Sequence, residues 1–286
     1  MKLLLVLLVA FLATTTSLPT KDSLPKYYHN VIGIPEAARI KAAEEAMDFS
    51  GSRIVGGSAA HLGQFPWFGG MLVYLTPVVV SYCGCSLLSN TRAVTAAHCW
   101  IDGRYTVSHF EIVFGSTTLF WGGVRVTTST VEAHADYDPS YSQNDVAIIT
   151  LPRVTFTNNV RSIALPSNLL DNDFIGYVGQ AAGFGFQSDG ISTTQTLHHA
   201  PLTVVDNEVC RSVYVMRLIA SMLCVDGSEG RSTCAGDSGG PLSITSGVQP
   251  ILVSGRFQSS ISSILPCGVR QSRTAPTPYT RGCRRD

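Results

Sequence analysis

The stretch Gly236-Asp237-Ser238-Gly239-Gly240-Pro241 decides how this 286-residue chain is interpreted, because two further motifs stand upstream of it. The run TAAHC at residues 95–99 supplies His98, and NDVAII at residues 144–149 supplies Asp145. A serine hydroxyl is a weak nucleophile until an imidazole accepts its proton and a carboxylate holds that imidazole in the right tautomer. Ser238, His98 and Asp145 are therefore the candidate nucleophile, base and orienting carboxylate.

Charge and composition exclude several classes of function. The chain has 20 basic and 20 acidic side chains, so its net charge of zero gives no electrostatic footprint for nucleic acid or an anionic membrane. A content of 45% hydrophobic and 14% charged residues is typical of a globular protein with a sizeable core. We expect neither nucleic acid nor a membrane among its partners.

The N-terminus predicts export. A basic start at Lys2 precedes the apolar run Leu3–Ala13, and small or hydroxylic residues follow as far as Ser17. This pattern is typical of a secretory signal peptide and is too short for a membrane span. We therefore expect a signal peptide at residues 1–17 and a secreted, extracellular protein, in which the eight cysteines can form disulfides.

Residues 18–53 differ in character from the rest of the chain. They are mixed and polar, have no cysteine and little to bury, and include a helix-capable run at 34–46 with Pro35 and Glu36 at its start. We interpret 18–53 as an activation propeptide, with a small autonomous helical module as the alternative. From residue 54 on, short β-branched runs between Gly, Pro, Asn and Asp predict an all-β sandwich or barrel set with few helices.

The three motifs resemble those of the chymotrypsin-like (trypsin-fold) serine endopeptidases, in the family's order and over residues 54 to about 242. The resemblance implies a protease domain at 54–286 made of two packed antiparallel six-stranded β-barrels, at 54–165 and 166–286. It implies acyl transfer through Ser238, with His98 as general base and acid and Asp145 as the group that orients it. Backbone N–H groups of Gly236 and Ser238 would form the oxyanion hole.

No metal or other cofactor is expected. The six histidines besides His98 are scattered, and no His, Cys or acidic spacing matches a zinc or EF-hand site. His198 and His199 form an adjacent pair, which we interpret as loop or surface residues.

Activation and specificity follow from the same resemblance. A trypsin-like protease would cut after Arg53, and the freed ammonium of Ile54 would pair with buried Asp237 and order the oxyanion loop. Six residues before the nucleophile, at the base of the family's specificity pocket, stands Ser232, where an acid would select Lys or Arg. Large apolar or aromatic side chains are therefore the implied preference. The run GRSTC at 230–234 looks most like the brachyurin group of insect and crustacean chymotrypsins, which includes collagenolytic members.

By family position, three disulfides are implied, Cys83–Cys99, Cys210–Cys224 and Cys234–Cys267. Cys85 and Cys283 are left over, and an unpaired Cys85 could exchange with the neighbouring bridge.

The resemblance decays beyond about residue 252. The family's pocket-lining strand has an aromatic residue that is missing between Ser254 and Gly255. Only five residues follow Arg281, where the family has a further strand and an amphipathic helix. We expect an atypical tail from about residue 253 with its C-terminal helix missing or altered, through evolutionary change or a shifted reading frame.

These features predict a monomeric digestive serine endopeptidase, made as a zymogen and secreted, with the gut lumen as a candidate location. Its expected partners are protein or peptide substrates, a trypsin-like activating protease and protein protease inhibitors. A catalytically impaired protease homologue that acts by binding is the alternative that the aberrant C-terminus favours. A regulatory cascade protease is a third reading, which the missing cysteine-rich prodomain and non-acidic Ser232 disfavour.

Overall fold

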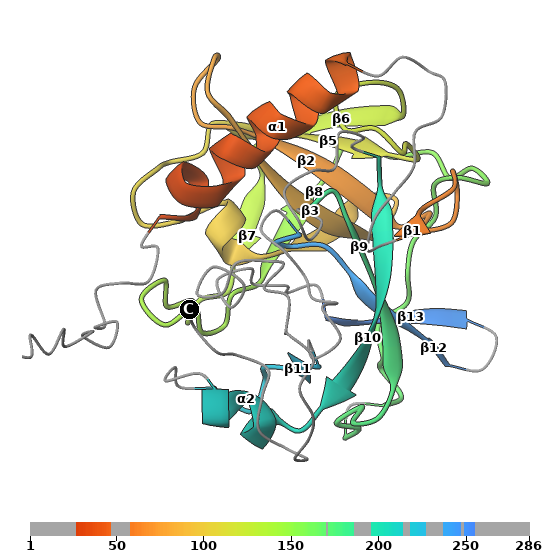
Figure 1. The fold of residues 1–286 in the computed structure, drawn as a ribbon. Helices are drawn as coiled ribbons and strands as arrows, with labels where there is room; N and C mark the ends of the chain where they lie inside the picture. Colours follow the sequence, from red (N-terminus) through yellow and green to blue (C-terminus); the bar gives the residue numbers. More distant parts are fainter. Residues whose placement is uncertain are drawn as a thin grey trace, which may run out of the picture.

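Two antiparallel β-sheets and a few helices make up the protein, described here by a computed structural model (Figure 1). The structure describes residues 27–46, 58–169, 171–185, 196–213, 218–226, 237–246 and 249–254. Its helical elements are the π-helical turn η2 (His29–Gly33), α1 (Ile34–Glu45), the 3-10 turn η3 (Ala97–Cys99) and α2 (Asn207–Val213). This is the mostly-β architecture of two curled sheets that the sequence predicts.

The first sheet closes on itself. Its strands, in spatial order, are β6 (Val124–Thr128), β5 (His109–Phe114), β2 (Phe68–Tyr74), β3 (Val80–Ser89), β4 (Arg92–Thr95), β8 (Ala147–Thr150) and β7 (Val131–Ala133). The two outermost strands, β6 and β7, are separated in the chain by only Ser129 and Thr130. One bent stretch therefore pairs with both edges of the sheet, and counting it once gives a closed six-stranded barrel.

The second sheet carries the turn that holds Ser238. Its strands, in spatial order, are β1 (Ser58–Ala59), β10 (His198–Val205), β9 (Val178–Gly183), β12 (Leu242–Ser246) and β13 (Gln249–Ser254), with β11 (Cys224–Val225) paired to β10. Leu242 at the start of β12 pairs with Ala181 of β9. The turn that precedes β12 is thereby held at one end of this sheet.

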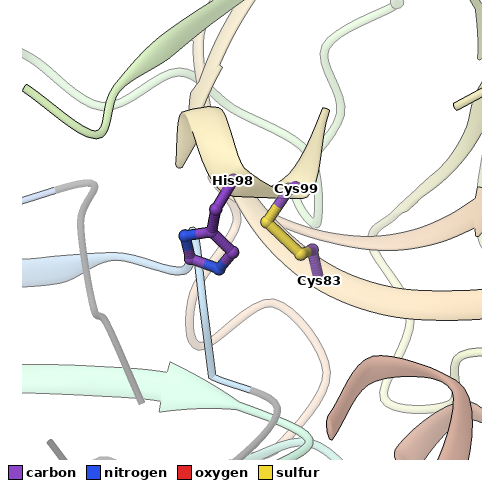
Figure 2. A group of neighbouring side chains, drawn as sticks. All are labelled: Cys83, His98 and Cys99. Atoms are coloured by element: carbon purple, nitrogen blue, oxygen red, sulfur yellow. A yellow bond between two sulfur atoms is a disulfide. The ribbon is translucent and has the colours of Figure 1, made fainter. Parts of the chain in front are cut away.

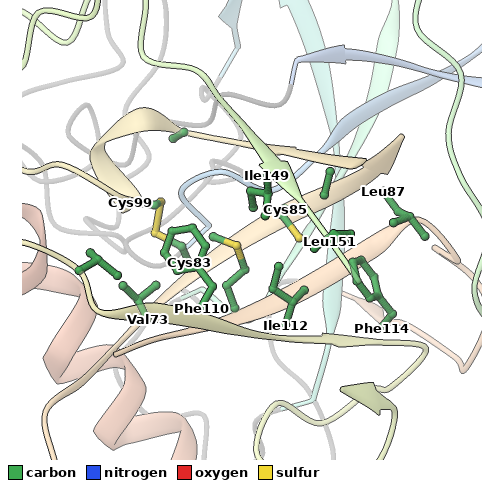
Figure 3. Packing of buried hydrophobic residues seen from close by; sticks show 14 of the residues in the cluster. Val73, Cys83, Cys85, Leu87, Cys99, Phe110, Ile112, Phe114, Ile149 and Leu151 are labelled. Carbon is green, nitrogen blue, oxygen red and sulfur yellow. A yellow bond between two sulfur atoms is a disulfide. The ribbon is translucent and has the colours of Figure 1, made fainter. Parts of the chain in front are cut away.

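Apolar side chains fill the interior of the first barrel (Figure 3). On β5, Phe110, Ile112 and Phe114 occupy alternate positions and are all fully buried, as the two-residue period of a strand requires. Burying each such side chain stabilises the fold by about 1.5–3 kcal/mol. This rigid core supports the strand ends that carry the candidate catalytic residues.

Helix α1 packs against β3 on the outside of the first barrel (Figure 1). Pro35 in its first turn and acidic Glu36 match the helix start that the sequence predicts. The expectation that this segment has little to bury is wrong. Ala37 and Ile40 are only 2% and 0% exposed, and they belong to an apolar cluster that includes side chains of β2, β3 and β9.

The predicted C-terminal tail and the expected absence of a membrane span can be compared with the described residues only in part. The atypical tail from about residue 253 lies beyond Ser254 and therefore outside the described residues. Within the described ranges, no helix has the length and apolar character that crossing a membrane would require.

Candidate active site

The first sheet brings His98 and Asp145 together. Strands β4 and β8 pair in antiparallel register, with Thr95 opposite Ala147. His98 follows Thr95 by three residues and Asp145 precedes Ala147 by two, so both lie at the same end of the two strands. Asp145 is fully buried and accepts hydrogen bonds from Nδ1 of His98 at 2.7 Å and from its backbone N–H at 2.8 Å. With Nδ1 as the donor, Nε2 is the basic nitrogen of the ring.

Ser238 reaches the same place from the second sheet. The backbone N–H of Gly240 donates to the carbonyl of Asp237 at 3.0 Å, which closes a turn around Ser238. Gly239 in this turn has φ +80°, the left-handed conformation that glycine adopts without strain at the third position of a type II turn. The carbonyl of Ser238 accepts a hydrogen bond from the N–H of Gly84 on β3 at 2.7 Å, which fixes the turn to the first sheet.

At Gly84 the backbone of β3 lies directly against the turn that carries Ser238. A Cβ atom at Gly84 would lie 2.9 Å from Cα of Gly240, closer than such atoms approach. The Thr95 hydroxyl donates to the Gly84 carbonyl at 2.7 Å and holds this part of β3 next to the end of β4. A side chain at Gly84 would therefore push the nucleophile turn away from His98.

A disulfide braces the turn that carries the histidine. Cys83 of β3 is bonded to Cys99, the residue after His98, and Figure 2 shows the imidazole projecting from that same turn. These three side chains form the one group of potential metal ligands found among the described residues. Because both sulfurs are in the disulfide, the group lacks the thiolates that a metal would need.

Three of the remaining cysteines lie in the described residues, and three do not. Cys210 is bonded to Cys224, which joins α2 to β11. The predicted Cys234–Cys267 bridge and Cys283 lie outside the described residues. Cys85 is free and fully buried in the barrel core (Figure 3). Burial raises the pKa of its thiol, and since the thiolate is the species that attacks a disulfide, exchange with the neighbouring bridge is suppressed in the folded protein.

Tyr28 covers the candidate catalytic residues, and sequence reasoning missed it. Its ring lies 4.5 Å from the His98 ring between centroids, tilted by 58°. Its hydroxyl donates to the carbonyl of Tyr82 at 2.8 Å and shares a side-chain hydrogen bond with Ser238. Burial raises the pKa of Tyr28 far above its usual range, so the phenol stays neutral. The only sequence signal was the aromatic cluster at 27–29 ahead of the helix.

The covered site is closed to solvent. Ser238 is 0% exposed and His98 is 6% exposed. Nε2 of His98 is buried and has no hydrogen-bond partner among the residues that the structure describes. The His98–Asp145 link is therefore formed, whereas the nitrogen that would take a proton from Ser238 is not engaged with it.

Several predicted site residues fall outside the described ranges. These are Gly236 of the oxyanion hole, Ser232 of the pocket, and Arg53 and Ile54 of the activation junction. Asp237 is described and half-buried, and its carboxylate accepts the backbone N–H of Gly185 at 2.9 Å.

The interpretation of His198 and His199 as loop or surface residues is wrong. Both lie in β10, an internal strand of the second sheet, where His198 pairs with Ala59 and with Gly183. His198 is buried, which lowers its pKa, and its Nδ1 contacts the carbonyl of Thr196. The pair faces two ways because neighbouring residues of a strand alternate.

Comparisons with known proteins find trypsins and a collagenase as similar proteins. The family model described as Trypsin matches residues 54–271. The chain is 35% identical over 191 residues to a collagenase of Hypoderma lineatum, covering 66% of this chain and 71% of that protein. It is 33% identical over 216 residues to trypsin beta of Drosophila erecta, covering 74% and 81%. A solved structure of HL collagenase superposes with a TM-score of 0.61 and 30% identity, over 69% of this chain and 91% of that one.

Proposed function

The chain belongs to the trypsin family of serine endopeptidases, and on that premise we propose that it is a secreted digestive enzyme made as an inactive precursor. The observation that carries the proposal is the buried pair of His98 and Asp145, joined at 2.7 Å, against which the second sheet sets the Ser238 turn. Protein or peptide chains are its substrates, and its expected compartment is extracellular, with the gut lumen as the candidate place.

The proposed chemistry is acyl transfer through Ser238. Asp145 holds the imidazole of His98 with Nδ1 as donor, so Nε2 can take the proton of the serine hydroxyl as it attacks the scissile carbonyl. The imidazolium then returns that proton to the leaving amine. Backbone N–H groups of Gly236 and Ser238 would stabilise the negative oxygen of the tetrahedral intermediate.

Activation by cleavage after Arg53 is part of the proposal. The matched family model begins at Ile54, the residue whose amino group would be freed. Its ammonium would pair with Asp237, whose half-buried carboxylate also accepts the backbone N–H of Gly185. A buried charge is stable only when paired, so the pairing can order the neighbouring oxyanion loop. The activator would be a trypsin-like protease, and protein inhibitors and a monomeric state are expected.

The proposed preference is for large apolar or aromatic side chains, or broad, with collagen as a candidate substrate. Two features of the chain support it. Ser232 places no acid at the base of the pocket, and one of the similar proteins is a collagenase. The trypsins among the relatives make selection of Lys or Arg the competing possibility.

The test uses the full chain cut after Arg53 with immobilised trypsin, with the cleaved segment removed by gel filtration and the new N-terminus at Ile54 verified by mass. Hydrolysis of peptide anilides ending in Phe, Leu or Arg is then measured. We expect cleavage after Phe and Leu to exceed cleavage after Arg. Ser238→Ala should lower the rate by about 10⁴-fold or more, whereas Ser140→Ala, at an exposed serine, should leave it unchanged.

Retention of activity in Ser238→Ala would show that another group is the nucleophile. An inactive but folded and correctly cut wild-type chain would favour the impaired homologue that acts by binding.

A further inference from the structure

The segment 27–46 lies across the candidate active site instead of apart from it. The π-helical turn η2 and helix α1 both pack on β3, the strand that also carries Cys83 and Gly84. At Gly33 the segment touches β3 so closely that a Cβ atom would overlap Oγ of Ser81. The segment therefore behaves as a ligand of the first barrel, and Tyr28 is the part of it that reaches His98 and Ser238.

Tyr28 blocks the chemistry in two ways. Its hydroxyl is hydrogen-bonded with the side chain of Ser238, the group that must be free to attack. Its ring lies against the imidazole of His98, 4.5 Å between centroids, and covers the site, leaving Ser238 fully buried. A substrate carbonyl cannot come within the roughly 3–3.5 Å that attack by Ser238 requires while the ring is there.

The residues next to Tyr28 fix it in place. The backbone N–H of His29 donates to the Asp102 carboxylate at 3.1 Å, and Nδ1 of His29 lies 2.8 Å from the Ser81 hydroxyl. The hydroxyl of Tyr105 donates to the side-chain oxygen of Asn30. His29 itself is 0% exposed. Several directed hydrogen bonds thus hold the blocking ring at a single position.

The far end of the segment has its own anchor. The Glu44 carboxylate accepts the backbone N–H groups of Leu119 and Phe120, at 2.5 and 2.8 Å, in the connection between β5 and β6. Between the two anchors, Ala37 and Ile40 bury apolar surface against the barrel. Anchors at both ends and an apolar face between them are what a peptide needs in order to stay bound without a covalent link.

The segment is placed to block the site without being cut. Tyr28 has helical backbone angles, φ −53° and ψ −48°, and leads directly into η2. The group that meets Ser238 is a phenol hydroxyl, which offers no carbonyl carbon for attack.

We propose that residues 27–46 are an active-site inhibitor of their own protease domain, which stays bound after cleavage at Arg53 and also inhibits as a free peptide, through Tyr28 against His98 and Ser238. The inference rests on the proposed function, because it assigns a second barrier to the activation described above. Cleavage then creates the new N-terminus, and dissociation of the segment uncovers the site. No cysteine lies in 27–46, so no disulfide retains it.

The test adds synthetic peptide 27–46 to the cut enzyme after the cleaved segment has been removed by gel filtration. We expect competitive inhibition of anilide hydrolysis. A Tyr28→Ala peptide should inhibit about 30-fold more weakly, as expected for loss of a buried aromatic anchor. The matched control is Tyr27→Ala, whose partly exposed ring lies 5.5 Å from the Arg104 guanidinium and which should inhibit within about fivefold of the parent peptide.

Unchanged hydrolysis in an excess of peptide would overturn the inference, as would equal inhibition by the Tyr28→Ala peptide. Fluorescein-labelled peptide, followed by anisotropy with the same cut chain, separates this inference from the proposed function. If the cut chain proves inactive, the proposed function fails, and anisotropy still decides the docking. Binding that weakens with Tyr28→Ala supports it, and absence of binding refutes it.

Discussion

The two sides of the His98 ring are built differently. On the Asp145 side, a buried carboxylate accepts two hydrogen bonds from His98, and both residues lie next to the ends of paired strands of the first sheet. On the Ser238 side, the nucleophile comes from the second sheet and Tyr28 lies over the ring. The His98–Asp145 half of the site is therefore formed in the uncut chain, whereas Tyr28 covers the Ser238 half.

The largest expected effect tests whether the His98–Asp145 half of the site is independent of the binding of residues 27–46. Asp145→Asn should lower the activity of the cut enzyme by about 10⁴-fold, because an amide would favour the wrong tautomer of His98. Affinity for peptide 27–46 should change less than about threefold, because that segment is anchored by Asp102, Ser81 and the backbone N–H groups of Leu119 and Phe120. Kinetics and anisotropy on the same preparation measure the two effects, and Asp136→Asn, at an exposed position, is the control. Comparable losses in both would mean that the two halves are coupled.

A smaller effect tests how strongly the apolar face of α1 contributes to the binding of residues 27–46 to the first barrel. Ile40→Ala removes a fully buried side chain of α1 and should weaken docking by about 2–4 kcal/mol, or about 30- to 1,000-fold in peptide affinity. Lys41→Ala is the control, because this exposed side chain forms a 3.8 Å ion pair with Glu45 of the same helix, which contributes little to stability. Equal affinities for the two peptides would show that α1 does not bind through its apolar face.

The smallest effect concerns pH and the Ser238 half of the site. Burial lowers the pKa of His29 to about 4, with the Asp102 carboxylate opposing the fall and His98 adding to it. The docked segment therefore needs a neutral imidazole. The contribution of His29 to docking is complete above its ordinary pKa of 6.5 and is lost by up to about tenfold per pH unit as the pH falls from 6.5 toward 4.

Two carboxyl groups of the segment have the opposite effect on the pH dependence of docking, because a raised pKa favours docking as the pH falls. Burial raises the pKa of Glu36 and of Glu44, although Arg39 and two backbone N–H groups respectively favour their charged forms. The comparison is therefore between peptide 27–46 and its His29→Asn variant, with inhibition constants measured at pH 7.5, 6.5 and 5.5. Ser81, Tyr28 and Tyr105 also lie beside His29. Parallel pH curves for the two peptides would rule out a role for His29.

Sequence patterns were sufficient for the parts of the fold that local rules control. Period-two runs such as 110–114 predict strands, and Pro35 with Glu36 marks the start of α1. His98, Asp145 and Ser238 each sit in a motif of their own, so their types and order could be found without coordinates.

Contacts between distant segments could not be predicted in the same way. Nothing local in the sequence indicates that Tyr28 meets Ser238, 210 positions later (238 − 28), because that contact depends on how α1 lies on β3. His198 was misassigned for a related reason. The adjacent histidines look polar in isolation, whereas the pairing of β10 with strands on both sides buries one of them.

Strand β1 limits how far the new N-terminus could travel. Ala59 pairs with His198, which pairs with Gly183, beside which the Asp237 carboxylate lies. Two strand spacings of about 4.8 Å put Ala59 roughly 10 Å from Gly183. Ile54 precedes Ser58 by four residues, a reach of at most about 14 Å. The freed amino group is thus tethered near the Asp237 carboxylate, at an effective concentration on the order of millimolar. Its insertion should proceed at the same rate at any dilution, whereas rebinding of the departed segment becomes slower as the solution is diluted.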